Sequence, residues 1–201
     1  MLIELLSTRV GSTISFNSLS EDLQRDDKTI KRWIQLLEQM YIVFRVSPYA
    51  KNISRAIKKA GKYYFYDIGK VSGDESAKLE NLVALSLKKE IEFHEDVSGI
   101  PGQLHFIQMK GGKEIDFLVV QKNLNPRMIE VKLSDANPSD NFKIFEKYFS
   151  NISKIHLVKN LDQEYQSKQG VKVKSALDFF SSNNPLKWVR FIKSIKAPIL
   201  F

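Results

Sequence analysis

The run "QLHFIQMKGGKEIDFLVVQKNLNPRMIEVKL", residues 103–133, constrains the fold of this chain most. It contains three apolar segments separated by turn residues, which is the pattern of three consecutive strands. Gly111 and Gly112 supply the two positive-φ positions of a tight hairpin turn. We therefore predict that residues 104–110 pair antiparallel with residues 114–120, and that a third strand follows.

Charged residues occupy faces of these strands where a packed sheet favours apolar side chains. The predicted turn sets Ile107 opposite Asp116, which shares its strand face with Leu118. In the third strand Glu130 and Lys132 lie two residues apart, which is about 7 Å along one face. The three charges either form a functional site or make a partly buried ion-pair cluster. A third alternative is that this strand face is simply open to water.

A clear helix precedes the strands in "SAKLENLVALSLKKEI", residues 76–91. Glu80 shares a face of it with Val83 and Leu87, so its carboxylate is expected to point toward the interior. The acidic run after this segment, which contains Glu95, is expected to be a solvated loop. A second helix, "PSDNFKIFEKYF", and a strand, "KIHLVKN", follow the three strands. This order predicts an α/β fold, a mixed sheet flanked by helices.

The N-terminal part shows a different pattern, two short helices followed by two strands. Ser18 and Asp27 are expected to cap the two helices, and apolar residues recur in the second helix at helical spacing. Two such helices resemble a helix-turn-helix. The strands "YIVFRVSPY" and "KYYFYD" enclose a basic loop, which is where a winged helix has its wing.

Residues 69–78, "GKVSGDESAK", interrupt both patterns with Gly, Ser and Asp. We therefore expect a small winged-helix domain over residues 1–70 and an α/β domain over residues 71–201. Cations of the second helix and the basic loop are the ones expected to bind nucleic acid through its phosphates. They are Lys28, Lys31, Arg32, Lys51, Arg55, Lys58 and Lys59. The alternative is that the helices pack on a neighbouring domain and the lysines keep the surface soluble.

Charge and composition narrow the class of protein. The formal net charge is +8, which favours phosphate-bearing partners, either nucleic acid or an anionic membrane surface. The chain contains no cysteine, so it has no disulfide, thiolate metal site or cysteine nucleophile. No apolar run approaches the roughly 20 residues of a transmembrane segment, and no signal peptide is recognisable. We expect a cytoplasmic protein, and the sequence leaves its oligomeric state open.

The helix acid and the strand charges together resemble a known family. An acid on a helix, then Asp, then Glu-x-Lys on the next strand resembles the PD-(D/E)XK restriction-endonuclease-like superfamily. Glu80 matches the helix acid, Asp116 the strand acid, and Glu130 and Lys132 the Glu-x-Lys motif. The chain as a whole is similar to the uncharacterised C-terminal region appended to many prokaryotic AAA-type ATPases. The motifs "KYYFYDIG", "LENLVA", "EIDFLV" and "IEVKLS" carry this resemblance.

This resemblance implies a nuclease-like domain behind the winged helix, with DNA as the expected nucleic acid and an AAA-type ATPase as a partner. The sequence leaves RNA open as the alternative substrate. The implied chemistry is phosphodiester hydrolysis with Mg²⁺, for which Mn²⁺ can substitute. Asp116 and Glu130 would hold the metal, and Glu80 would hold a second metal or a metal-bound water. Lys132 would either orient the attacking water or stabilise the pentacovalent state. The chain lacks the phosphate-binding loop of the ATPase module, so we expect neither a bound nucleotide nor ATP hydrolysis.

Two functional hypotheses therefore remain. The first is a Mg²⁺-dependent nuclease to which the winged helix delivers DNA. The second is a catalytically inactive module that binds DNA or an ATPase partner and cuts nothing. An open cleft with Asp116, Glu130 and Lys132 converging in it favours the enzyme, whereas direct salt bridges favour the module. The basic amphipathic segment 185–201 either lies on a membrane or partner or packs back on the sheet. The three histidines, His94, His105 and His156, show no metal-binding spacing and are expected to be ordinary half-buried or surface residues.

Overall fold

The computed structural model describes residues 1–50, 60–109 and 111–182. The predicted wing residues Lys51, Arg55, Lys58 and Lys59 and the segment 185–201 lie outside the described residues. The N-terminal elements are α1 (Leu2–Ser7), β1 (Thr13–Ile14), α2 (Phe16–Leu23), α3 (Asp27–Gln39), β2 (Val43–Pro48), β3 (Gly61–Phe65) and a 3₁₀ turn, η1 (Ile68–Lys70). The others are α5 (Glu75–Ser98), β4 (Gly102–Gln108), β5 (Glu114–Gln121), β6 (Arg127–Lys132), α6 (Asn141–Glu146), β7 (Ser153–Val158), β8 (Tyr165–Gln166), β9 (Lys172–Ser175) and α7 (Ala176–Ser182).

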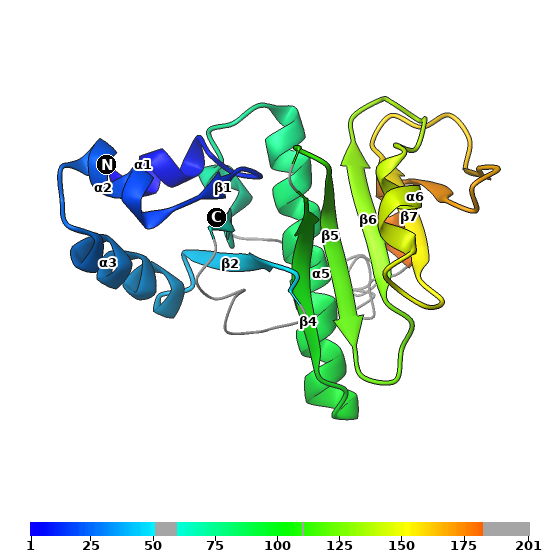
Figure 1. Ribbon diagram of the computed structural model, residues 1–201, viewed down its shortest axis with the longest axis horizontal. Helices are drawn as coiled ribbons and strands as arrows, with labels where there is room; N and C mark the ends of the chain where they lie inside the picture. The colour runs from blue at the N-terminus through cyan, green and yellow to red at the C-terminus, as the bar shows by residue number, and fades with distance from the viewer. Residues whose placement is uncertain (51–59, 110, 183–201) are drawn as a thin grey trace, which may run out of the picture.

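The described strands form one mixed sheet of nine strands in the order β1-β3-β2-β4-β5-β6-β7-β9-β8. The three N-terminal strands pair antiparallel with one another, and β2 then joins the rest of the sheet by a parallel pairing with β4. Strands β6, β7 and β9 are parallel neighbours. The predicted α/β class with a mixed, helix-flanked sheet is therefore confirmed. Helices α1 to α3 gather at the β1 end of the sheet (Figure 1).

The predicted hairpin of β4 and β5 is also confirmed, but its register near the turn was predicted wrongly. His105 pairs with Leu118, which agrees with the predicted offset, whereas Ile107 pairs with Ile115 and not with Asp116. The register shifts between His105 and Ile107. Such a bulge adds a residue to one strand and re-aims the local side chains. Asp116 lies in this irregular part of β5.

Helices α5 and α6 cover opposite faces of the sheet. The larger core cluster contains α5 residues together with Phe117, Ile129 and Val131. The smaller cluster contains two phenylalanines of α6 together with Leu118 and Met128. Successive residues of a strand point to opposite faces, so Glu130 and Lys132 share the α6 face with Met128. Glu80, which is on α5, lies on the other side of the sheet.

Helix α5 is longer than the sequence suggested. It runs to Ser98 and ends at Gly99 in a left-handed conformation, so Glu95 is on its last turns and not in a loop as predicted. Asp74 caps its start by accepting a hydrogen bond from the Ala77 N–H group. None of the described helices combines the length and the apolar character that crossing a membrane requires.

The N-terminal helices form as expected, although the predicted capping residues were displaced. Ser15 caps α2 and Asp26 caps α3, where Ser18 and Asp27 had been predicted. Each cap side chain accepts a hydrogen bond from the N–H group three residues later, which is the usual geometry of a cap at the first position before a helix. Helix α3 buries Ile30, Ile34 and Leu37.

Candidate functional site

Glu80 is enclosed by the N-terminal strands. Its Oε1 atom accepts a hydrogen bond of 2.7 Å from the Tyr64 hydroxyl and lies 3.4 Å from the Lys62 Nζ atom. Gly11 covers the other oxygen: its φ is +81°, and a Cβ atom there would lie only 2.7 Å from Oε2. The predicted inward orientation of Glu80 agrees with this position. Oε1 is thus bound by β3 side chains, and Oε2 lies close to the Gly11 backbone.

Lys62 is the cation at the centre of this cluster. Only 1% of the residue is exposed. Its ammonium group forms ion pairs with Glu80 and Glu114 and lies 5.4 Å from the centre of the Phe106 ring. Burial alone would lower the pKa of Lys62, but the charges of Glu80 and Glu114 outweigh it and raise that pKa. The lysine therefore stays charged inside the protein.

Sequence reasoning placed Lys62 at the start of the strand "KYYFYD" but did not identify it as a site residue. The signal was present in "KYYFYD", because Lys62 and Tyr64 alternate on one face of a strand whose residues are all buried. Nothing in the sequence, however, indicated that β3 would lie against α5. The acids that receive these two side chains were therefore not foreseeable from strand pattern alone.

Asp116 lies between β5 and β6, where the pairing of these two strands ends at Phe117 and Ile129. Its Oδ2 atom accepts a 2.8 Å hydrogen bond from the Val131 N–H group. Burial raises the pKa of Asp116, and the nearby charge of Glu80 raises it further. Lys62 and the Val131 hydrogen bond act in the opposite direction, and the resulting pKa is about 7.

Glu130 is buried on the opposite face of the sheet with a different set of partners. Its Oε2 atom lies 3.2 Å from His156 Nδ1 and 3.4 Å from the Ser139 N–H group, and Lys132 Nζ lies 3.8 Å from Oε1. Burial alone would raise the pKa of Glu130, but the hydrogen bonds from His156 and Ser139 and the charge of Lys132 lower it. Glu130 is therefore an anion with partners inside the protein.

Both ring nitrogens of His156 contact oxygen atoms. Its Nε2 atom lies 2.8 Å from the Asp135 carbonyl oxygen, which can only accept, so Nε2 donates. Nδ1 faces a carboxylate oxygen, and that contact is attractive only when a proton lies between the two atoms. Glu130 and His156 thus form a buried hydrogen-bonded pair. His156 is fully buried, so the prediction of an ordinary histidine was wrong.

The predicted site residues thus fall into two groups. Glu80 and Asp116 interact with each other and with Lys62, whereas Glu130 is paired with His156 and Lys132 on the other face. Among the described residues no three His, Asp or Glu side chains are arranged to hold a metal ion. Glu80 Oε1 contacts a hydroxyl and an ammonium group, Asp116 Oδ2 accepts from a backbone N–H group, and Glu130 contacts an imidazole, an ammonium group and a backbone N–H group. The residues as arranged do not fit the metal, and the predicted Mg²⁺ site stays a prediction.

Helix α3 presents two different surfaces to solvent. Lys28, Lys31 and Arg32 are exposed on one side, as the helical spacing predicted. On the adjoining side Trp33 is 38% exposed and Leu36 51% exposed. The helix therefore combines a basic stripe with an apolar one.

Three comparisons relate the chain to known proteins. Residues 75–179 match the family model described as Domain of unknown function (DUF4143), and residues 1–72 match that of Domain of unknown function (DUF8612). The E3 ubiquitin-protein ligase RNF14 of Danio rerio is 28% identical over 139 residues, which cover 58% of this chain and 30% of that protein. A solved assembly of Thermococcus gammatolerans McrB AAA+ hexamers with bound McrC is similar at 11% identity and a TM-score of 0.33, over 80% of this chain and 34% of that one. The chain thus spans about a third of the length of each.

Proposed function

The chain belongs to the DUF4143 family, a domain found in AAA-ATPase-associated proteins, and we propose that it acts in such a system as a nucleic-acid-binding module that does not cut its ligand. The observation that carries the proposal is the buried Lys62 ammonium group among the acids. A metal-dependent nuclease requires carboxylate oxygens that a cation can reach. Here the Lys62 ammonium group is paired with Glu80, one of the three predicted metal ligands, and with Glu114.

A buried lysine is a strong competitor for such a site. Removing one partner of a buried ion pair leaves an uncompensated charge and costs about 3–5 kcal/mol. A metal ion that displaced Lys62 from Glu80 and Glu114 would have to supply that free energy in addition to its own dehydration. The paired His156 opposes a metal at Glu130 in the same way. We infer that these acids stabilise the fold.

The basic stripe of α3 supports the nucleic-acid half of the proposal. Lys28, Lys31 and Arg32 are exposed on the second helix of a helix-turn-helix-like pair. Exposed cations that contact DNA phosphates release counterions, and this gives affinity that does not depend on sequence. The apolar stripe beside them, which contains Leu36, is the surface we assign to a protein partner of the AAA type.

Fluorescence anisotropy with a short labelled DNA duplex tests this proposal. Changing Lys28, Lys31 and Arg32 to Ala should weaken binding and reduce the slope of log affinity against log salt by about 0.9 for each phosphate that the variant no longer neutralises. A matched control changes Lys122, Lys143 and Lys168, which are exposed elsewhere. Equal weakening in the two variants would show a general charge effect and contradict a binding site on α3. The variant Leu36→Lys should retain DNA binding and lose any AAA-type ATPase that co-purifies with the native chain.

Metal-dependent hydrolysis is the second candidate, and the raised pKa of Asp116 favours it. A buried carboxyl group with a pKa of about 7 is stabilised as an anion when a cation binds to it in place of its proton. Lys132 is a nearby cation, and 44% of its side chain is exposed. Nicking of supercoiled DNA in Mg²⁺ or Mn²⁺ by the native chain, abolished in Asp116→Asn, would establish this function. The same result would overturn the proposal of a module that does not cut.

A further inference from the structure

Helix α3 carries a row of exposed apolar side chains at the outside of the molecule (Figure 1). Trp33, Leu36 and Met40 recur at positions i, i+3 and i+7, which brings them to one side of the helix over about 10 Å. Tyr41 follows directly after the helix. The exposed fractions of the four residues are 38%, 51%, 59% and 72%. Single exposed apolar residues are normal, but a cluster of this kind indicates a binding surface. We call these four residues the α3 stripe.

The shape of the α3 stripe favours a second helix as its ligand. The opposite side of α3 buries Ile30, Ile34 and Leu37, so the stripe is a narrow ridge and not the broad apolar face of a helix that lies in a membrane. A helix bonds its backbone groups internally, so α3 offers no edge to which a strand could add. An open hollow of about 520 Å³ along the ridge leaves room for side chains of a helix packed beside it. It is lined by Arg32, Trp33, Gln35, Leu36 and Gln39.

The charge that borders the start of the α3 stripe is positive. Arg32 lies four residues before Leu36, and Lys28 lies four residues before Arg32, so the exposed cations follow one line beside the stripe. By the same helical spacing, the acids Asp27 and Glu38 are on the opposite side of α3. Arg32 is therefore a cation that a ligand on the stripe meets directly.

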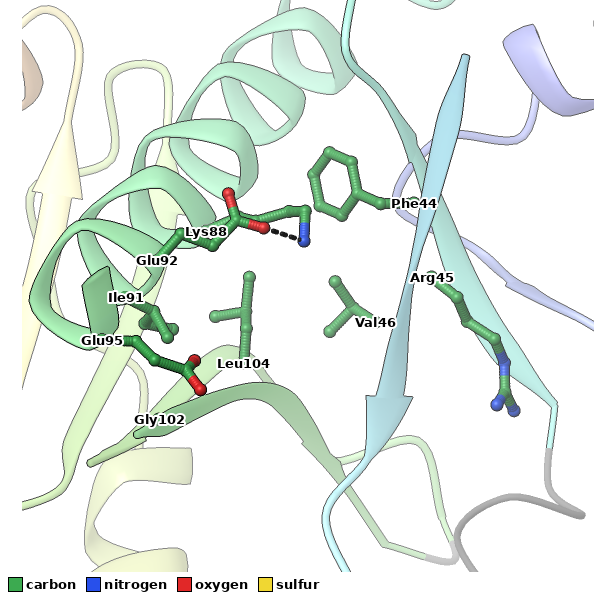
Figure 2. A pocket seen from close by; sticks show the side chains of 9 residues that line it. All are labelled: Phe44, Arg45, Val46, Lys88, Ile91, Glu92, Glu95, Gly102 and Leu104. Atoms are coloured by element: carbon green, nitrogen blue, oxygen red, sulfur yellow. Dashed lines mark ion pairs between the residues drawn. The ribbon is translucent and has the colours of Figure 1, made fainter. Parts of the chain in front are cut away.

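The far end of the α3 stripe differs in charge. The Tyr41 ring meets the Tyr66 ring edge to face, with 5.6 Å between the ring centres. The Lys88 ammonium group lies 6.0 Å from the centre of the Tyr66 ring, but it forms an ion pair of 2.6 Å with Glu92 (Figure 2). That cation is neutralised within the protein. Positive charge is consequently offered to a ligand at the Arg32 end of the stripe.

We propose that the α3 stripe binds an acidic amphipathic helix of the protein partner, and that this helix and nucleic acid exclude each other, a regulation that rests on the proposed function. The apolar side of the partner helix covers Leu36 and Met40, and acids at its edge pair with Arg32. The charge of Arg32 determines the sign of the partner. It also opposes a second copy of this chain as the ligand, because two α3 helices would bring their cations together.

Exclusion follows from the position of Arg32 between the two surfaces of α3. Nucleic acid needs Arg32 for a phosphate, and the partner helix needs it for a carboxylate. A helix with its side chains is about 10 Å across, so one that lies on Leu36 also covers Arg32 one turn away. Its acids then repel phosphates that approach the remaining cations of α3. Binding of the partner helix should therefore release nucleic acid.

Selection from a display library of helix-forming peptides of about 18 residues tests the docking, with the whole chain as bait. Apolar and charged positions are randomised. We expect enriched peptides to have apolar residues at i, i+3, i+4 and i+7 with Asp or Glu beside them, and not Lys or Arg. Their affinity, measured by anisotropy on labelled synthetic copies, should fall at least about tenfold in Leu36→Gln. Leu177→Gln is the matched control, since Leu177 is 66% exposed on α7, and it should bind as the native chain does.

Competition on a labelled DNA duplex tests the exclusion. A selected peptide should release the duplex from the native chain, and Leu36→Gln should require at least about tenfold more peptide for the same release. Arg32→Ala should weaken the binding of both ligands. Lys31→Ala should weaken that of the duplex alone, because Lys31 is on the side of α3 away from the stripe.

The possible results separate the two proposals. If the duplex binds but stays bound at saturating peptide, the exclusion is wrong while the proposed function stands. If the peptide binds through Leu36 but the native chain binds no duplex, the proposed function is wrong and the exclusion with it. Failure to enrich acidic amphipathic peptides, or equal peptide binding by Leu36→Gln, would overturn the docking. Dimerisation or binding to phosphatidylglycerol vesicles that is lost in Leu36→Gln, in place of peptide binding, would also overturn it.

Discussion

Replacing Asp116 by Asn should make the protein more stable at neutral and alkaline pH. The native side chain is held where its charge is costly, since burial and Glu80 raise its pKa from 3.8 to about 7. Asn keeps the shape and an oxygen that can accept the Val131 N–H hydrogen bond, but it never ionises. The variant therefore removes the free-energy cost of the buried charge and keeps the hydrogen bond from Val131.

The sign and size of the effect follow from proton linkage. Because the folded-state pKa lies above the unfolded value, the native protein binds the proton more tightly, and this stabilisation is lost as pH rises through the folded pKa. A difference of about 3 pKa units corresponds to about 4 kcal/mol in full. Of this, about 2 to 3 kcal/mol is lost between about pH 5 and pH 8. Above pH 5 Glu130 stays ionised, because its pKa is lowered.

Urea denaturation followed by circular dichroism at several pH values measures this directly. The free energy of unfolding of Asp116→Asn minus that of the native chain should increase steadily from pH 5 to pH 8, with equal m-values at each pH. Subtraction removes the titration of groups common to both proteins. Asp162→Asn is the control for removal of an exposed carboxylate and should show a flat difference. The reasoning would be refuted if the free energies of unfolding of the native chain and of Asp116→Asn ran parallel from pH 5 to pH 8. It would also be refuted if the variant lost stability relative to the native chain as pH rises.

Other changes test the remaining contacts. Lys62→Met should lower the free energy of unfolding by about 3–5 kcal/mol in urea titrations, because it leaves the Glu80 and Glu114 carboxylates without their cation. If those acids can then accept a metal, millimolar Mn²⁺ should raise the thermal midpoint of this variant and leave that of the native chain unchanged. Gly11→Ala should destabilise by more than about 1 kcal/mol in the same assay, since its φ is +81° and the new methyl meets Glu80. The lowered pKa of Glu130 predicts that stability falls as pH drops below about 4.5, and His156→Gln should reduce that acid sensitivity in pH-dependent melting.

The order of elements could be predicted from the sequence because each signal is local. The Gly111-Gly112 turn, the apolar runs around it and the helical spacing before it all act within a few residues. The mispredicted register shows the limit of this reasoning: the bulge of β4 and β5 moves Asp116 between strands, and no local pattern indicates it.

The partners of the predicted site residues were harder to foresee. Glu80 on its helix and Asp116 and Glu130 on their strands were all identified as charges, but the cations that Glu80 and Glu130 contact come from distant segments. Lys62 reaches the acids only because β3 lies against α5, and His156 reaches Glu130 only because β7 pairs with β6. Such contacts depend on tertiary arrangement. Strand periodicity indicates that a charge is buried without indicating what compensates it.

The pairing of β2 with β4 also affects how cooperatively this chain folds and whether its two halves can fold separately. Two family models meet near residue 73, yet the sheet crosses that point, and Lys62 on one side neutralises Glu80 and Glu114 on the other. Separate expression of the two halves would expose a sheet edge and leave buried charges without counterions. Folding should therefore be a single cooperative transition, slowed by its long-range strand pairing. Natural recombination that exchanged only one half would have to replace the lysine and its acids together.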